Sequence, residues 1–178
     1  MALQDQNLVL SSAQAITGTA QSTYAYDILN GNTLAVASGA YTTNAQIGNA
    51  TYFGEDLGLG RGVGTPAIEV FSGSGTPASA TSLQIAAQGA PDAGTGNTSG
   101  VTYVINIQTQ VMLLASILAS IRLAAFDFPR RTPGLSMPRF IALDYVVNGS
   151  FTGLTVTAYI NLGGTSAQST LGQYASNY

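Results

Sequence analysis

The sequence contains no cysteine, no histidine, no lysine and no tryptophan among its 178 residues. Without cysteine, the chain cannot form a disulfide framework, a cysteine zinc finger or a thiol nucleophile. Without histidine or lysine, it can build neither a Ser-His-Asp triad nor a Ser-Lys pair. Carboxylates are therefore the side chains left for acid–base chemistry.

Charge of either sign is also scarce. Only 7% of the residues are charged, against about 25% in a typical soluble domain. Charge keeps free molecules apart in solution, so this scarcity favours a chain that works inside an assembly. The alternative is a free domain solvated by its many Ser, Thr, Asn and Gln side chains. The net charge of −3 and the absence of a basic patch argue against a nucleic-acid partner.

Long hydrophobic runs are missing as well. The most apolar stretch, Val111–Ile121, has 11 residues, whereas a membrane-spanning helix needs about 20. The first residues include no positively charged segment followed by an apolar one, so we expect no export signal. A membrane partner is not expected.

Alternation with a period of two dominates the sequence. In residues 101–107, Val101, Tyr103, Ile105 and Ile107 alternate with other residues, which predicts that these four share one face of a strand. Turn-forming pairs such as Asn148-Gly149 separate the strand-like segments. Further strands are predicted at residues 8–10 with 13–17, 24–29, 34–37, 67–71, 83–88, 122–128, 140–147 and 154–161.

This pattern predicts a single all-β domain over residues 1–178, a jelly-roll-like β-sandwich of about eight strands. The last two strands, 140–147 and 154–161, are predicted to form a hairpin. At most one short helix is expected, within 111–120. The residues from about 163 onward are expected to form a polar tail.

No motif indicates catalysis, a metal or a cofactor. The alternating glycines at 58, 60, 62 and 64 are not followed by a helical pattern, so they do not match a dinucleotide-binding loop. The adjacent Glu55 and Asp56 are more typical of a solvated turn than of a calcium site. Asp27, Asp127 and Asp144 lie in or at the ends of predicted strands and could meet as a carboxylate pair. We predict a protein that is not an enzyme.

Two groups of residues are candidates for protein contacts. Arg130 and Arg131 lie between prolines, which would hold their side chains outward, and Arg139 follows nearby. An ordinary solvated turn explains the first two equally well. Leu3 and Leu8 could belong to an N-terminal arm that adds to a partner's sheet. The alternative is that this segment is the first strand of the chain's own sheet.

Several segments together resemble a known family. They are DQNLVLSSAQAIT, STYAYDI, FGEDLGLGRGVGTP with AIEVF, SATSLQIAAQ, and RLAAFDFPRRTPGLSMPRFIALDYVVNGSFTGLTVTAYINL. The chain resembles the capsid cement, or decoration, proteins of tailed phages, of the type found in the short-tailed phage of Bordetella. The segments between 31 and 52 and after Leu162 look longer than the family pattern.

The resemblance implies a structural virion protein made in the host cytoplasm. It would form a homo-oligomer, most simply a dimer, with a trimer as the alternative, and bind the major capsid protein on the outside of the head. There it would bridge capsomers and stabilise the DNA-filled shell. The alternative function is a carbohydrate- or receptor-binding β-sandwich module of a tail or head fibre. The tyrosines at 41, 52, 174 and 178 could serve such a module.

Overall fold

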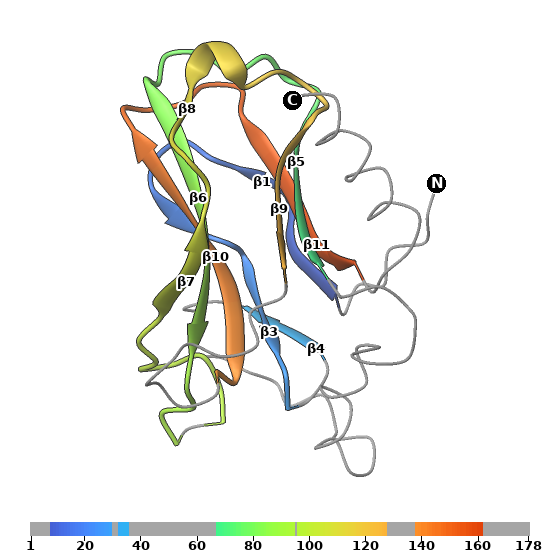
Figure 1. The fold of residues 1–178 in the computed structure, drawn as a ribbon, viewed down its shortest axis with the longest axis vertical. Helices are drawn as coiled ribbons and strands as arrows, with labels where there is room; N and C mark the ends of the chain where they lie inside the picture. The colour runs from blue at the N-terminus through green and yellow to red at the C-terminus, as the bar shows by residue number, and fades with distance from the viewer. Residues whose placement is uncertain (1–7, 30–31, 36–66, 95, 128–137, 162–178) are drawn as a thin grey trace.

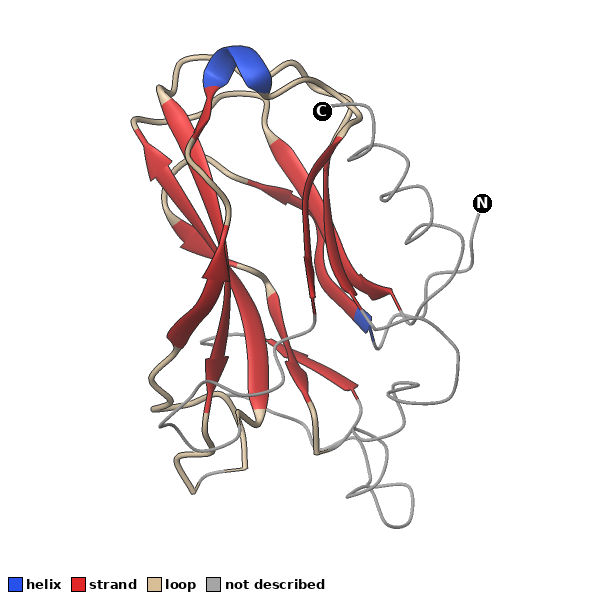
Figure 2. Ribbon diagram, viewed as in Figure 1, coloured by secondary structure: helices blue, strands red, loops and turns tan. Residues whose placement is uncertain are grey.

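The computed structural model describes residues 8–29, 32–35, 67–94, 96–127 and 138–161. These residues form two antiparallel β-sheets that pack face to face (Figure 1). Figure 2 shows that strands and connecting loops make up nearly all of the described chain. The predicted all-β sandwich is confirmed.

One sheet has four strands and the other has seven. In the four-stranded sheet the order is β1 (Val9–Ala15), β11 (Thr155–Asn161), β5 (Ala67–Ser72) and β9 (Arg122–Asp127). The seven-stranded sheet has the order β4 (Asn32–Ala35), β3 (Tyr24–Asp27), β10 (Phe140–Asn148), β6 (Ser82–Ala90) and β7 (Val104–Gln108). Two short strands complete it, β2 (Ala20–Gln21) beside β10 and β8 (Met112–Leu113) beside β6.

The strand order is that of a jelly roll. Without the short strands β2 and β8 and the added strand β4, eight strands remain. Counted along the chain, they run 1-8-3-6 in one sheet and 2-7-4-5 in the other. This is the arrangement that two interlocked Greek keys produce. The predicted jelly-roll-like sandwich of about eight strands is confirmed.

The predicted hairpin between the last two strands is wrong, because β10 and β11 belong to opposite sheets. The connection between them is anchored in the sandwich, since Phe151 and Leu154 are buried. The amide of Phe151 donates to the carbonyl of Thr17, and Thr152 pairs with Ala78 through two backbone hydrogen bonds of 2.9 Å. The chain therefore crosses from one sheet to the other with these two apolar side chains buried.

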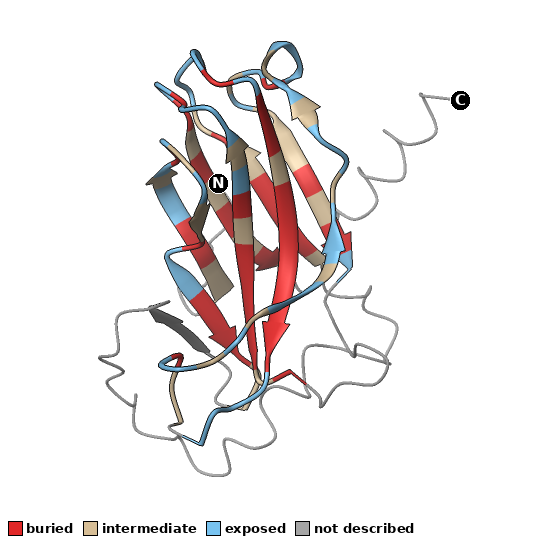
Figure 3. Ribbon diagram, turned by 90° about the vertical axis from the view of Figure 1, so that its left-hand side faces the viewer, coloured by how far each residue is buried: buried red, intermediate tan, exposed pale blue. Residues whose placement is uncertain are grey.

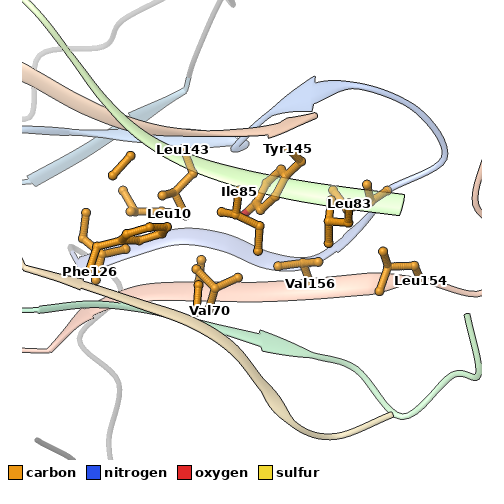
Figure 4. Packing of buried hydrophobic residues seen from close by; sticks show 14 of the residues in the cluster. Leu10, Val70, Leu83, Ile85, Phe126, Leu143, Tyr145, Leu154 and Val156 are labelled. Carbon is orange, nitrogen blue, oxygen red and sulfur yellow. The ribbon is translucent and has the colours of Figure 1, made fainter. Parts of the chain in front are cut away.

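The core lies between the sheets and is filled by alternate residues of facing strands (Figure 4). Leu10 comes from β1 and Phe126 from β9, while Ile85 and Leu143 come from the seven-stranded sheet. Leu10, Ile85 and Leu143 are completely buried. Burial of a side chain of this size contributes about 1.5–3 kcal/mol to folding.

At most one short helix was predicted within residues 111–120, and the structure has one 3-10 turn there, at Leu114–Ser116. Met112 and Leu113 just before it pair with β6 instead, as strand β8. Within the described ranges, no helix is long and apolar enough to cross a membrane.

Candidate functional site

The most connected charged group lies at the end of the seven-stranded sheet where β3 and β10 meet. Arg139 precedes β10, and its guanidinium donates to both carboxylate oxygens of Asp27, at 3.1 and 3.0 Å. It also donates to the carboxylate of Asp92 and, at 3.3 Å, to the carbonyl of Gly96. Its Cζ lies 5.0 Å from the centre of the Phe140 ring. This arginine ties the loop after β6 to the sheet.

The two acids in this group are held in different ways. The side chain of Asp27 is fully buried and also accepts a 2.9 Å bond from the Leu29 amide. Burial raises the pKa of Asp92, but hydrogen bonds from the Gly94 amide, from Arg139 and from the Gly96 amide together lower it below the usual value. Burial likewise opposes the charged form of Arg139, yet its bonds to Asp27 raise the net pKa. Asp92 and Arg139 are thus held in their charged forms.

A second ion pair lies on the outer side of the four-stranded sheet. Arg122 of β9 lies 3.5 Å from Glu69 of β5, whose side chain is almost completely buried. Asn161 of β11 contacts the same carboxylate at 3.4 Å. Beside this pair, the rings of Phe71 and Tyr159 stack with centroids 5.7 Å apart. Both arginines in the described part of the chain therefore bind acids of their own fold.

The acids that remain are not brought together. Asp127 and Asp144 form no ion pair with another described residue. Asp144 is four residues along β10 from Phe140, which pairs with Asp27, so Asp27 and Asp144 are about 13 Å apart. Carboxylates that cleave glycosidic bonds stand about 5–9.5 Å apart. Asp127 lies in the other sheet, and the described residues include no group of three potential metal ligands.

The predicted contact residues have different outcomes. Leu3, Arg130 and Arg131 lie outside the described residues. Leu8 is half-buried and packs against the core, and β1, which follows it, pairs with β11 of the same chain. This placement agrees with the alternative that the segment belongs to the chain's own sheet. Arg139 is engaged inside the fold rather than held outward for a partner.

Exposed apolar side chains gather instead along one border of the seven-stranded sheet. Five of the eight large apolar residues that are exposed in the described part of the chain lie between 104 and 113. We call this group the apolar edge, and its members are Val104, Ile105, Ile107, Val111 and Leu113. The three most exposed are Leu113, Val111 and Ile105, at 61%, 57% and 47%. The sequence from 93 to 121 contains no charged residue.

A β-bulge distributes the apolar edge over both faces of the sheet. Ile107 pairs with Ala87 of β6, whereas Ile105 pairs with the next residue, Gln88, so Asn106 is the extra residue on β7. Because neighbouring residues on β6 point to opposite faces, Ile105 and Ile107 do so too. The prediction that Val101, Tyr103, Ile105 and Ile107 share one face is therefore wrong.

The start of that segment behaves differently from β7. Val101 and Tyr103 pack on the outside of the sheet against the small buried cluster of Ala25, Phe140 and Ala142. Figure 3 views the molecule from this side and shows buried residues along the central strands, with exposed chain passing in front of them. The apolar edge therefore begins at Val104, where the chain stops covering the outer face of the sheet and becomes its border strand, β7.

The sequence pattern did not single out the apolar edge, because alternation placed Ile105 and Ile107 on one face of a strand and the apolar stretch 111–121 was compatible with either buried core or an interface. A signal was nevertheless present, since no charge interrupts residues 93–121. A border strand usually carries charge or proline as protection against pairing with other chains.

No protein-family model matches this sequence, and no curated protein matches it either.

Proposed function

We propose that this chain is a structural virion protein, an auxiliary cement protein that binds the outer surface of a phage's major capsid protein lattice. The observation that carries the proposal is the jelly-roll order of the strands, combined with a sequence in which only 7% of the residues are charged. Jelly rolls are common among viral capsid domains. A surface so poor in charge suits a chain that is buried in an assembly.

The distribution of charge supports an adhesive role over a chemical one. Arg122 and Arg139 are neutralised within the fold, Asp27 and Asp144 lie about 13 Å apart along one sheet, and Asp127 belongs to the other sheet. A surface with few free charges loses little hydration when another protein covers it. Such a surface suits a building block that is buried on assembly.

Most of the sequence segments that resemble cement proteins contain strands of the described fold, whereas FGEDLGLGRGVGTP lies outside the described residues. STYAYDI contains β3, AIEVF begins β5, and SATSLQIAAQ contains most of β6. The final long segment includes β9, β10 and β11. Much of the resemblance therefore rests on strands that define the sandwich.

A cement protein acts through many weak contacts rather than one strong site. When one copy or one dimer bridges two capsomers, the second contact becomes effectively intramolecular. Retention then exceeds the affinity of either contact, and separating capsomers requires breaking several contacts at once. The shell is stabilised without any covalent step.

The test is cosedimentation of the purified protein with empty heads that lack it, followed by thermal disruption of those heads. We expect saturable binding at a fixed ratio to the major capsid protein and a higher disruption temperature. Heads that already carry the protein are the matched control and should bind no more. Failure to bind bare heads would reject the proposal, and a defined preference on a glycan array would then favour the receptor-binding alternative.

A further inference from the structure

We infer that the apolar edge is the surface through which two copies of this chain associate, with the β7–β8 border of one copy lying antiparallel to the same border of the second. β7 is the last strand of the seven-stranded sheet, and β8 continues along the same side of β6. In the described part of the chain, no strand pairs with their outer side.

The border from 104 to 114 is held in place before any partner arrives. The amide of Thr109 donates to the carbonyl of Ile85 at 2.8 Å, and its hydroxyl accepts from the Ile85 amide at 3.1 Å. Its carbonyl accepts from the side chain of Gln84, and the Leu114 amide donates to Thr81. The residues between β7 and β8 are therefore hydrogen-bonded to β6. Binding of a partner here would cost less conformational entropy, because the border is already ordered.

Backbone groups on the outer side of this border are available for pairing. Successive amides of a strand point in opposite directions, so the amide of Gln108, next to the inward Thr109 amide, points away from β6. An added antiparallel strand would satisfy such groups. Apolar side chains on both faces, including Ile105 and Ile107, would be covered at the same time.

The other borders with described side chains are more strongly protected than this one. β9 carries Arg122 and Asp127 at its two ends. β1 has two register shifts in its pairing and a positive φ of 47° at Ala13. β7 has the bulge at Asn106 but neither charge nor proline. Natural sheets use these devices to prevent pairing with other chains.

A second copy fits this border better than an unrelated chain does. An antiparallel arrangement about a two-fold axis places the same residues on both sides, so hydrogen-bond donors and apolar side chains match by symmetry. Residues 93–121 carry no charge, so this contact brings no like charges together.

This inference deepens the proposed function, because a two-fold dimer presents each capsid-binding surface twice. It does not depend on that function, since self-association is measured without heads. A monomer that still binds heads would overturn the inference and leave the proposed function intact. A dimer that uses the apolar edge but ignores heads would do the reverse.

The experiment is sedimentation equilibrium of the full chain over a range of concentrations. We expect a dimer, and we expect Ile107→Lys to raise the dissociation constant about 100-fold or more, because each dimer then holds two ammonium groups at an uncharged contact. Val146→Lys is the matched control. Val146 is an apolar residue of similar exposure on the central strand β10, and its replacement should leave the dimer unchanged.

A second readout uses the absence of cysteine. Gln108→Cys gives each chain a single thiol on the border, and a short bis-maleimide should link two copies efficiently. Thr23→Cys, on an exposed residue before β3, should link few. A monomeric wild-type protein, a dimer insensitive to Ile107→Lys, or equal cross-linking of both variants would overturn the inference. The cross-link remains decisive if Ile107→Lys fails to fold.

Discussion

The hydroxyl groups of Ser11 and Tyr145 lie 2.9 Å apart in the core, although 134 residues separate them in the chain. Ser11 belongs to β1 and Tyr145 to β10, so this bond joins the two sheets. The Ser11 hydroxyl donates to Gln14 at 2.8 Å and therefore accepts the proton of Tyr145. Both residues are completely buried, and burial raises the pKa of Tyr145 despite its hydrogen bond with Ser11.

Removing the acceptor of this bond should cost more than removing the donor. Ser11→Ala leaves the buried Tyr145 hydroxyl unsatisfied and should lower the free energy of unfolding by about 2 kcal/mol. Tyr145→Phe removes the polar group itself and should cost about 1 kcal/mol. Urea denaturation at pH 7 measures both changes. The reverse ranking would contradict a hydrogen bond that Tyr145 donates and Ser11 accepts.

Tyr103 provides the opposite case. Its buried hydroxyl has no hydrogen-bond partner in the described part of the chain, and burial raises its pKa to about 12. Tyr103→Phe should therefore leave stability unchanged or raise it by up to about 1 kcal/mol. The wild-type protein should lose stability between about pH 10 and 12, since the unfolded phenol ionises there while the folded one stays protonated. The variant should lose less over that interval in matched urea titrations.

The Arg139 group should be sensitive to loss of its cation. Arg139→Met leaves the buried Asp27 carboxylate without its bidentate partner and should lower the free energy of unfolding by about 3–5 kcal/mol. Asp27→Asn in the same chain should restore part of the loss, because the remaining buried group is then neutral. Thermal melts of the single and double variants measure this coupling. Equal stability of wild type and Arg139→Met would contradict the role assigned to this arginine.

The contribution of Asp144 to stability should change with pH in the opposite sense to that of Asp92. Burial raises the pKa of Asp144, so its ionised form is disfavoured in the folded state. Asp144→Asn should therefore stabilise the protein at pH 7, by about 0.5 kcal/mol or less because the side chain is partly solvated. The gain should vanish as the pH falls below the pKa of this carboxyl, where the wild-type group is also neutral. Urea denaturation at pH 7 and pH 3 tests this, with Asp127→Asn on an exposed position as control.

The connection that carries the chain between sheets should depend on Gly153. Its φ is 75°, and a Cβ placed there would lie 2.7 Å from the carbonyl oxygen of Thr76. Gly153→Ala should lower the free energy of unfolding by about 2 kcal/mol or more, from strain in the backbone and from this contact. Gly18→Ala is the control, because a Cβ at Gly18 meets nothing within 4 Å. Similar melting temperatures for the two variants would contradict the proposed strain.

Local pattern was sufficient to find most of the strands. The predicted segments 67–71, 83–88, 122–128 and 140–147 correspond to β5, β6, β9 and β10 within one or two residues at each end. Alternating β-branched and aromatic residues specify a pleated strand through contacts that are mostly local. Partner choice is different, because it depends on which apolar faces meet. The predicted hairpin of 140–147 with 154–161 failed for that reason.

The sequence by itself determined the all-β class, the strand positions and the poverty in charge, because these follow from composition and periodicity. Tertiary structure decided what each of the few charges does. It engaged Arg139 with Asp27, which is 112 residues away, and it separated Asp27 from Asp144. It also made β7 the border strand of its sheet, and one extra residue at Asn106 put Ile105 and Ile107 on opposite faces. A two-residue period cannot reveal such a bulge, since the bulge is defined only by the partner strand.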